Sequence, residues 1–503
     1  LQRLIMGKNL LFICLGLLLL TFGCRKEQIF VSNAVTLQFS ADTIFLDTVF
    51  ATIGSSTRTL KVKNPTSDNL LITNVRLGNG PSSFYRMNVN GTSTKNMSDV
   101  EILANDSIYI FIEVTADVAG ATSLLYTDSI IFTTAGNVQN VQLVTLAKDA
   151  YFYLPNAILN IPNDPYPPIQ VPYRRLDCDD IWSNDKPHEV YGYGLVPENC
   201  SLTILPGAEV HFHAGSGLLI DEGAQLLIDP NEAGDVESNP VVLQGDRLEP
   251  DYENIAGQWG GLFGGIYFVR GSFGNVINNA IIKNSNIALR ADSTAASTQN
   301  LKIKDSYVMN NSRVGIYGGF ANIQAENVVL ANNGLYSFFA LGGNYNFLHC
   351  TFANYWNSAS RNSPSIGLTN FFENANGDND IREIENAYFG NCIVYGNNRS
   401  EFGVAKLEGG DLNYKFANGL MRLDKDPDDN SYDVQDPNFF LDCIFNSDPN
   451  FMDEYNYDYQ LDTLSPAMDM GNTADGALVP FDILKLSRDF NGLPDVGAYE
   501  RYE

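Results

Sequence analysis

Six short segments in the second half of the chain share one pattern of polar and apolar positions. In each, a polar residue is followed by a small residue, then by any residue, then by a large apolar one. Another mostly apolar position lies two residues before the polar one. The polar positions, separated by 26, 22, 22, 42 and 51 residues, are Asn279, Asp305, Asn327, His349, Asn391 and Asp442. Such spacing predicts a solenoid with about 22 residues in each coil.

The apolar positions flanking each polar residue cannot all face inward from one straight strand, because successive side chains alternate between the two faces. We therefore expect the chain to bend at the polar residue, where Asn and Asp tolerate left-handed backbone angles. In stacked coils these residues would form a hydrogen-bonded corner ladder. The third residue of each segment should point outward but carries little charge, so we expect the insertion between His349 and Asn391, or a ligand, to cover it.

Several stretches of the second half resemble known solenoids. They are residues 202–207 (LTILPG), 259–262 (WGGL) and 391–397 (NCIVYGN). They resemble the right-handed parallel β-helix family, the pectin-lyase-like proteins. Residues 465–471, 488–492 and 495–500 resemble the C-terminal element of choice-of-anchor β-helix lipoproteins. The resemblance implies an all-β protein with a β-helix over residues 181–503, ending in a C-terminal cap.

Residues 33–150 have a different pattern. Short runs of alternating residues, such as 108–114 (IYIFIEV), separated by Gly, Asn and Asp, predict a β-sandwich of about seven strands. The stretches 59–64 (TLKVKN) and 70–72 (LLI) resemble the Ig-like domains that precede solenoids in surface lipoproteins. Between them and the solenoid, the many prolines of residues 151–180 predict an extended linker.

The N-terminal 23 residues have the composition of an export signal. After Met6, with residues 1–5 interpreted as upstream extra sequence, a basic Lys8 precedes an apolar run over 10–20. The run ends at Gly23-Cys24, which resembles a bacterial lipoprotein site with Cys24 as the lipidated residue. Ordinary signal cleavage is the alternative, because Phe22 is bulkier than the residue usual there. We expect an exported protein, lipid-anchored to a bacterial membrane, at the outer membrane or the cell surface.

Export permits disulfides, so Cys178 and Cys200 are candidates for one that braces the start of the solenoid. Cys350, Cys392 and Cys443 occupy the small position of the repeat. Equivalent positions in adjacent coils lie about 4.8 Å apart, within disulfide reach. Free thiols packed as small apolar groups are the favoured interpretation.

The formal net charge of −28 argues against nucleic acid as a partner, because phosphates are bound by clustered Lys and Arg. Acidic residues concentrate between residues 424 and 462, where twelve Asp or Glu accompany one Lys. Oxygen-rich clusters suit Ca²⁺, so Asp424, Asp426 and Asp428 are candidate ligands. A solvated acidic loop is the alternative, because the stretch lacks the glycine and final Glu of an EF-hand.

The first functional hypothesis is that the solenoid binds a polysaccharide or cell-surface glycan. Aromatic side chains that could stack on sugars are dense in the middle coils, and the candidates are Tyr317, Tyr336, Tyr345, Tyr355 and Trp356. Pectin-lyase-like proteins include polysaccharide lyases and glycoside hydrolases, so such an activity is the alternative. The sequence contains no recognisable catalytic constellation, and basic candidates such as Lys283 and Arg290 are more typical of a solubilising surface.

Overall fold

The computed structural model describes residues 30–31, 33–50, 54–115, 125–163, 166–294, 298–374, 376–424, 432–490 and 492–502. The chain divides into two compact units, residues 1–148 and 149–503. Among the described residues, helix is limited to α2 (Thr473–Leu478) and the 3₁₀ turns η1 (Gly80–Ser82), η2 (Pro250–Tyr252) and η3 (Glu454–Asn456). Within those ranges, the structure contains no helix long and apolar enough to cross a membrane.

The first unit is a β-sandwich of two five-stranded sheets around one apolar core. One sheet contains β1 (Gln38–Phe39), β3 (Arg58–Lys63), β8 (Ser107–Val114), β5 (Tyr85–Val89) and β6 (Thr92–Thr94). The other contains β2 (Thr43–Phe50), β10 (Asn137–Lys148), β9 (Leu125–Thr134), β4 (Leu70–Leu77) and β7 (Asn96–Ile102). The described strands number ten rather than about seven. The additional ones include the short edge strand β6, joined to β5 by a turn in which Asn90 and Gly91 have positive φ.

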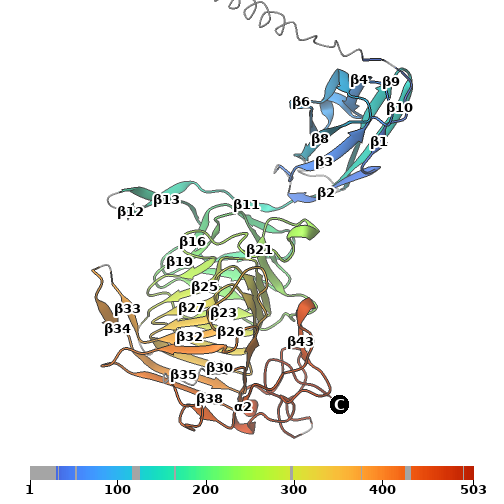
Figure 1. Ribbon diagram of the computed structural model, residues 1–503. Helices are drawn as coiled ribbons and strands as arrows, with labels where there is room; N and C mark the ends of the chain where they lie inside the picture. Colours follow the sequence, from blue (N-terminus) through green and yellow to red (C-terminus); the bar gives the residue numbers. More distant parts are fainter. Residues whose placement is uncertain are drawn as a thin grey trace, which may run out of the picture. The chain divides into compact units, whose positions relative to one another are not determined.

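The second unit is a stack of parallel coils (Figure 1). Nineteen strands form one long sheet: β11 (Tyr151–Tyr153), β14 (Asp180–Trp182), β15 (His188–Val190), β17 (Ser201–Ile204), β18 (Glu209–Phe212), β20 (Gln225–Ile228), β21 (Val241–Gly245), β23 (Asn275–Asn278), β24 (Ala280–Lys283), β26 (Leu301–Asn311), β28 (Asn322–Asn333), β30 (Gly343–Leu348), β31 (Thr351–Asn354), β35 (Ile384–Gly390), β36 (Ile393–Gly396), β38 (Leu412–Ala417), β39 (Leu420–Met421), β40 (Phe440–Leu441) and β41 (Ile444–Phe445).

A ten-stranded sheet closes the coils: β12 (Ala157–Asn163), β13 (Tyr166–Arg175), β16 (Tyr193–Val196), β19 (Gly217–Ile220), β22 (Ile266–Phe268), β25 (Ile287–Asp292), β27 (Val314–Gly319), β29 (Tyr336–Leu341), β32 (Ile366–Thr369) and β37 (Phe402–Ala405). Leu301 pairs with Ile323 and Ser306 with Val328, so one coil takes 22 residues here. The inward side chains of both sheets form one continuous core. The prediction of an all-β protein with a right-handed β-helix is confirmed.

The six polar repeat positions lie at the corner between two strands of each coil, and their φ angles fall between 49° and 53°. The ladder consists of hydrogen-bonded pairs rather than a continuous chain. Asn279 donates to Asp229 at 2.7 Å and Asn327 to Asp305 at 2.8 Å. Asn391 donates to His349 Nε2 at 2.9 Å. Because burial, with nearby Arg488, lowers the pKa of His349, the ring is neutral and can accept that bond.

The two long steps of the repeat have different causes. Between Asn391 and Asp442 lies an additional corner residue, Asn418, with φ of 50°. Between His349 and Asn391, in contrast, the strands before the two corners pair directly, so this step is one enlarged coil. Its insertion includes the hairpin of β33 (Phe371–Glu373) and β34 (Asn379–Ile381). Asn418 is therefore a seventh corner residue, which the repeat pattern in the sequence did not identify.

The prediction that residues 151–180 form an extended linker is wrong. Strand β11 pairs with β15 of the next coil, and the β12–β13 hairpin forms the edge of the ten-stranded sheet, where β13 pairs with β16. Proline lacks an N–H group, so it is tolerated in such edge strands. Cys178 and Cys200 are joined by a disulfide, with their Cα atoms 5.0 Å apart. Their separation of 22 residues matches the offset of the adjacent pair β14 and β17.

A second apolar cluster lies on the outer face of the long sheet. The outward residues Val329 and Ile393 are buried against the C-terminal segment, including Tyr459, Val496 and Tyr499. This segment contains β42 (Phe451–Asp453), β43 (Asp458–Leu461) and α2, and it lies beside the coils (Figure 1). The expected cover therefore exists, but the C-terminal segment provides it and not the 349–391 insertion. Cys350, Cys392 and Cys443 are free thiols.

Candidate glycan-binding surface

The outer face of the ten-stranded sheet carries a row of aromatic residues. Strand alternation buries Ile266 and Phe268 of β22 in the core and directs Tyr267, between them, outward. The strand register then aligns Tyr267 with Arg290, Tyr317 and Phe339 in successive coils, and all four are partly exposed. We call these four residues the aromatic column.

The side chains of the aromatic column lie against one another. The guanidinium carbon of Arg290 lies 4.4 Å from the ring centroid of Tyr267 and 5.8 Å from that of Tyr317. The rings of Tyr317 and Phe339 stack with centroids 5.6 Å apart. Cation–π contacts of this kind hold flat surfaces in place. The column therefore presents ordered aromatic faces at an open sheet surface.

The aromatic column ends at a strand with no side chain in the corresponding position. The ring of Tyr336 packs against Phe339 with centroids 4.9 Å apart. Both rings lie over Gly367 of β32, where an added Cβ would come within 2.7 Å of Tyr336 and 3.1 Å of Phe339. Glycine is thus required at this position for the rings to lie flat over the next coil.

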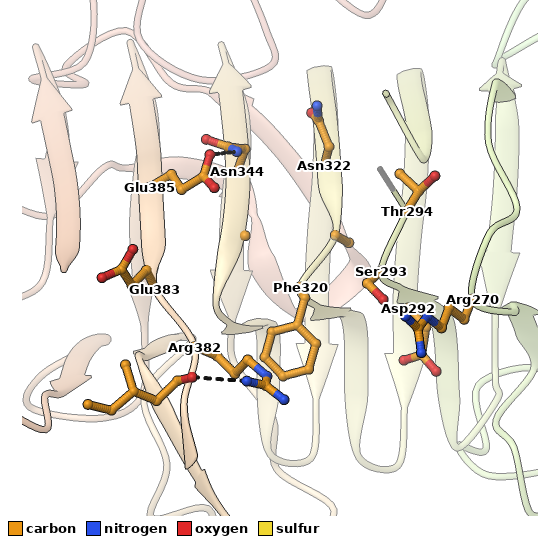
Figure 2. A pocket seen from close by; sticks show the side chains of 13 residues that line it. Arg270, Asp292, Ser293, Thr294, Phe320, Asn322, Asn344, Arg382, Glu383 and Glu385 are labelled. Atoms are coloured by element: carbon orange, nitrogen blue, oxygen red, sulfur yellow. Dashed lines mark hydrogen bonds between the residues drawn. The ribbon is translucent and has the colours of Figure 1, made fainter. Parts of the chain in front are cut away.

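A groove of about 780 Å³ follows the turns that lead from the ten-stranded sheet into the long sheet. Its lining is polar and charged, as Figure 2 shows, with Asp292 and Arg270 on one side and Glu383 and Glu385 on the other. The groove adjoins the aromatic column, because the hydroxyl group of Tyr267 donates a hydrogen bond to Asp292. The two features thus form one continuous surface.

An aromatic residue projects between the two charged sides of the groove (Figure 2). Phe320 has φ of 61°, a left-handed conformation that is unfavourable for such a side chain. Its N–H donates to the carbonyl of Leu341 at 2.8 Å, and Arg382 lies over its ring at 5.1 Å from the centroid. Backbone strain of this kind is often concentrated at functional sites.

The predicted aromatic residues fall into three places. Tyr317 and Tyr336 belong to the surface just described. Tyr355 and Trp356 line a separate hollow at the other edge of the ten-stranded sheet. Tyr345 cannot contact a polymer, because it is 1% exposed and its hydroxyl donates to Gly342 at 2.6 Å. The prediction of Tyr345 as a glycan-binding residue is therefore wrong, because its strand places it on the inward face.

The other predicted sites are only partly visible. Asp424 is paired with Arg399 at 2.9 Å, whereas Asp426 and Asp428 lie outside the described residues, as does Cys24. Within the described ranges, no three Asp, Glu, His or Cys side chains are grouped as metal ligands. Of the two basic candidates, Lys283 lies outside the groove lining and burial lowers its pKa, while Arg290 belongs to the aromatic column.

The sequence reasoning missed Tyr267, Asp292, Glu383 and Glu385. Tyr267 and Asp292 could have been found from the sequence. Once the coils are aligned, strand alternation and the coil offset place both on the outer face. The glutamates come from the enlarged coil, where the 42-residue step conceals the alignment. Only the folded chain brings them opposite Asp292.

Comparison with known families agrees with this architecture. A family model described as a right-handed beta helix region matches residues 189–355. No curated protein matched the chain. The matched residues contain the whole aromatic column and one side of the groove. The second unit is thus a right-handed parallel β-helix, with a charged groove beside an exposed aromatic column.

Proposed function

We propose that this protein binds a polysaccharide or cell-surface glycan along the aromatic column and the groove. The observation that carries the proposal is the continuity of the two features through Tyr267 and Asp292. Aromatic faces suit the apolar faces of sugar rings, and a few well-placed polar groups fix a ligand's orientation. Arg270, Arg290 and Arg382 can donate hydrogen bonds to sugar hydroxyl or carboxylate groups, but Asp292, Glu383 and Glu385 balance their charge on the same surface, so we expect no strong preference for an acidic polymer over a neutral one.

Affinity electrophoresis of the purified protein in gels containing acidic or neutral polysaccharides tests this proposal. We expect retardation in at least one of these polymers and a loss of about tenfold in affinity for Tyr317→Ala, corresponding to about 1.4 kcal/mol of binding energy. The control is Tyr166→Ala, which removes an equally large ring that is 71% exposed on the β12–β13 hairpin. Equal retardation of both variants would refute binding at the column.

Polysaccharide hydrolysis or elimination is the alternative, favoured by the carboxylates that face the groove from two sides. Incubation with the same polymers, with and without Ca²⁺, would distinguish the two. Unsaturated products detected by absorbance would indicate a lyase, and reducing ends alone would indicate a hydrolase. In either case Asp292→Asn and Glu383→Gln should abolish product while Tyr166→Ala does not.

We further propose that the protein is exported and lipid-anchored through Cys24 in the outer membrane, with the Ig-like first unit as a spacer. Support comes from the apolar run that ends at Gly23-Cys24. Detergent-phase partitioning of the expressed full chain tests the anchor. The wild type should enter the detergent phase and Cys24→Ala should not, whereas equal partitioning would refute lipidation.

A further inference from the structure

A pocket lies where the ten-stranded sheet ends, in line with the aromatic column. The strand register continues from Phe339 to Gly367 of β32 and then to Gly403 of β37, the last strand of that sheet. Gly403 lines a pocket of about 430 Å³, which we call the end pocket. Its other main lining residues are Asn362, Pro364, Asn398, Ser400 and Asp424. The aromatic column therefore leads toward a hollow at the end of the sheet.

Two successive glycines lower the sheet surface at this end of the column. The ring of Tyr336 lies over Gly367, and an added Cβ at Gly403 would come within 3.1 Å of the ring of Pro364. Neither glycine has positive φ, so the backbone conformation requires glycine at neither position. Two residues earlier in each strand, the register runs from Tyr336 through Pro364 to Ser400, so the side chains become smaller there as well. A polymer that lies on the aromatic rings thus meets a step down into the end pocket.

The walls of the end pocket are two turns that one buried ion pair connects. The guanidinium group of Arg361 donates to both carboxylate oxygens of Glu401, at 2.7 and 2.8 Å. The same carboxylate accepts bonds from the N–H groups of Ser365 at 2.9 Å and Asn398 at 2.8 Å. Buried ion pairs seldom add stability over well-packed apolar residues, so the clearest consequence of this one is that it fixes both turns. The polar groups of the pocket are therefore pre-organised.

The end pocket contains accessible polar groups that the described parts of the chain do not use. Within the ranges that the structure describes, the Asn362 amide and the Ser400 hydroxyl make no hydrogen bond, and both side chains are at least partly exposed. Beside them Arg399 Nε donates to Asp424 at 2.9 Å, with 71% and 57% of these side chains exposed. An exposed ion pair contributes little to stability. It does place a donor beside an acceptor, which suits two neighbouring hydroxyl groups.

We propose that the end pocket is a terminal subsite for one neutral sugar residue of the polymer, an inference that rests on the proposed function. The sugar ring packs against Pro364, and its hydroxyl groups bond to Asn362 and Ser400. A pair of neighbouring hydroxyls bonds to the ion pair of Arg399 and Asp424. The charged groups of the lining are paired with one another, so an uncharged sugar residue fits better than a carboxylated one.

The position of the end pocket sets a minimum length for the polymer. From Tyr267 to Gly403 the register passes through five strand-to-strand steps of about 4.8 Å, so the aromatic column and the end pocket together span about 24 Å. A chain that reaches both sites binds through both at once, which raises its affinity. A shorter chain binds to the column alone.

Isothermal titration calorimetry with defined oligosaccharides tests the subsite. The probes are neutral series of two to eight sugar residues derived from cellulose, xylan and mannan. In at least one series we expect the affinity to rise at least tenfold between about four and seven residues, where the chain becomes long enough to span both sites.

Two variants remove the subsite in different ways. The Asn362→Ala, Ser400→Ala double variant deletes the two polar groups, and Gly403→Leu fills the floor from a position without positive φ. All three positions are at least partly exposed, so at least one variant should unfold in urea like wild type. Each folded variant should bind the longest oligosaccharide at least tenfold more weakly and the trisaccharide unchanged. Tyr317→Ala should weaken binding at every length.

The control is Asn231→Ala, which alters an exposed amide outside the linings of the end pocket and the groove and should bind every probe like wild type. The subsite is overturned if the folded variants bind the longest oligosaccharide like wild type, or if the wild-type affinity stops rising at four residues. It is also overturned if no probe binds a protein that polysaccharide gels retard, although the proposed function then stands. Absence of retardation in every gel would instead refute the proposed function, and the subsite with it.

Discussion

The corner residue Asn327 connects the solenoid to its C-terminal cover, and its replacement by alanine tests the folding argument. The side chain is 1% exposed. Its amide nitrogen donates to Asp305 and to the carbonyl of Phe481, both at 2.8 Å. Its oxygen accepts a bond from Arg488 at 2.9 Å. Asn327→Ala removes all three bonds and retains a Cβ in the left-handed conformation.

The expected cost follows from these contacts. Three buried hydrogen bonds contribute about 1 kcal/mol each, so their loss costs about 3 kcal/mol. An alanine at φ of 53° adds about 1 kcal/mol of backbone strain. We therefore expect Asn327→Ala to lower the free energy of unfolding by about 4 kcal/mol. Asn327→Gly, which avoids the strain, should cost about 3 kcal/mol.

Urea unfolding followed by tryptophan fluorescence measures this cost for the solenoid alone, because all three tryptophans lie in the second unit. Asn413→Ala is the control, since Asn413 is exposed on β38 and its loss should change stability by less than about 0.5 kcal/mol. An Asn327→Ala protein within about 1 kcal/mol of wild type would refute the corner argument. Equal stability of the Ala and Gly variants would refute the backbone contribution.

The same assay checks three further expectations. Burial, with nearby Asp495, raises the pKa of Glu500 to about 8, so the folded state retains a proton that the unfolded state has lost, and stability falls as pH rises. Burial lowers the pKa of His349, and below about pH 6.5 this makes stability rise with pH, which opposes the effect of Glu500. We therefore expect the free energy of unfolding to fall by about 2 kcal/mol between pH 6.5 and 8. Glu500→Gln should remove this dependence of stability on pH. An unchanged dependence would show that another group causes it. The Cys178→Ser, Cys200→Ser double variant opens a 22-residue loop and should cost about 3 kcal/mol, while wild-type stability would show that the bond is dispensable. Ile393→Lys places a charge beneath the C-terminal cover and should cost at least about 3 kcal/mol and expose residues 450–502 to proteolysis, whereas an unaffected variant would show that the cover is loosely held.

Much of the solenoid could be predicted from the sequence because every coil makes the same kinds of contact. A strand alternates its side chains, a corner requires a residue that tolerates positive φ, and each coil repeats the same requirement about 22 residues later. Six corner residues follow from that arithmetic, and the structure shows that the Cys178–Cys200 disulfide has the same offset of 22 residues. Tyr317 was a candidate only because aromatic residues are dense in the middle coils, and the strand register of the structure places it on the outer face.

The tertiary structure alone decided which residues meet where the repeat is interrupted. The enlarged coil places Glu383 opposite Asp292, and the C-terminal segment returns to cover Ile393. Neither pairing has a fixed sequence offset, because a loop of any length can close onto a stacked coil at a cost that rises only slowly with length. Whether a side chain points inward or outward is also decided by the tertiary structure. Tyr345, for example, points into the core. The sequence by itself therefore determined the repeating frame, whereas the groove and the covered face depend on contacts between segments that share no periodicity.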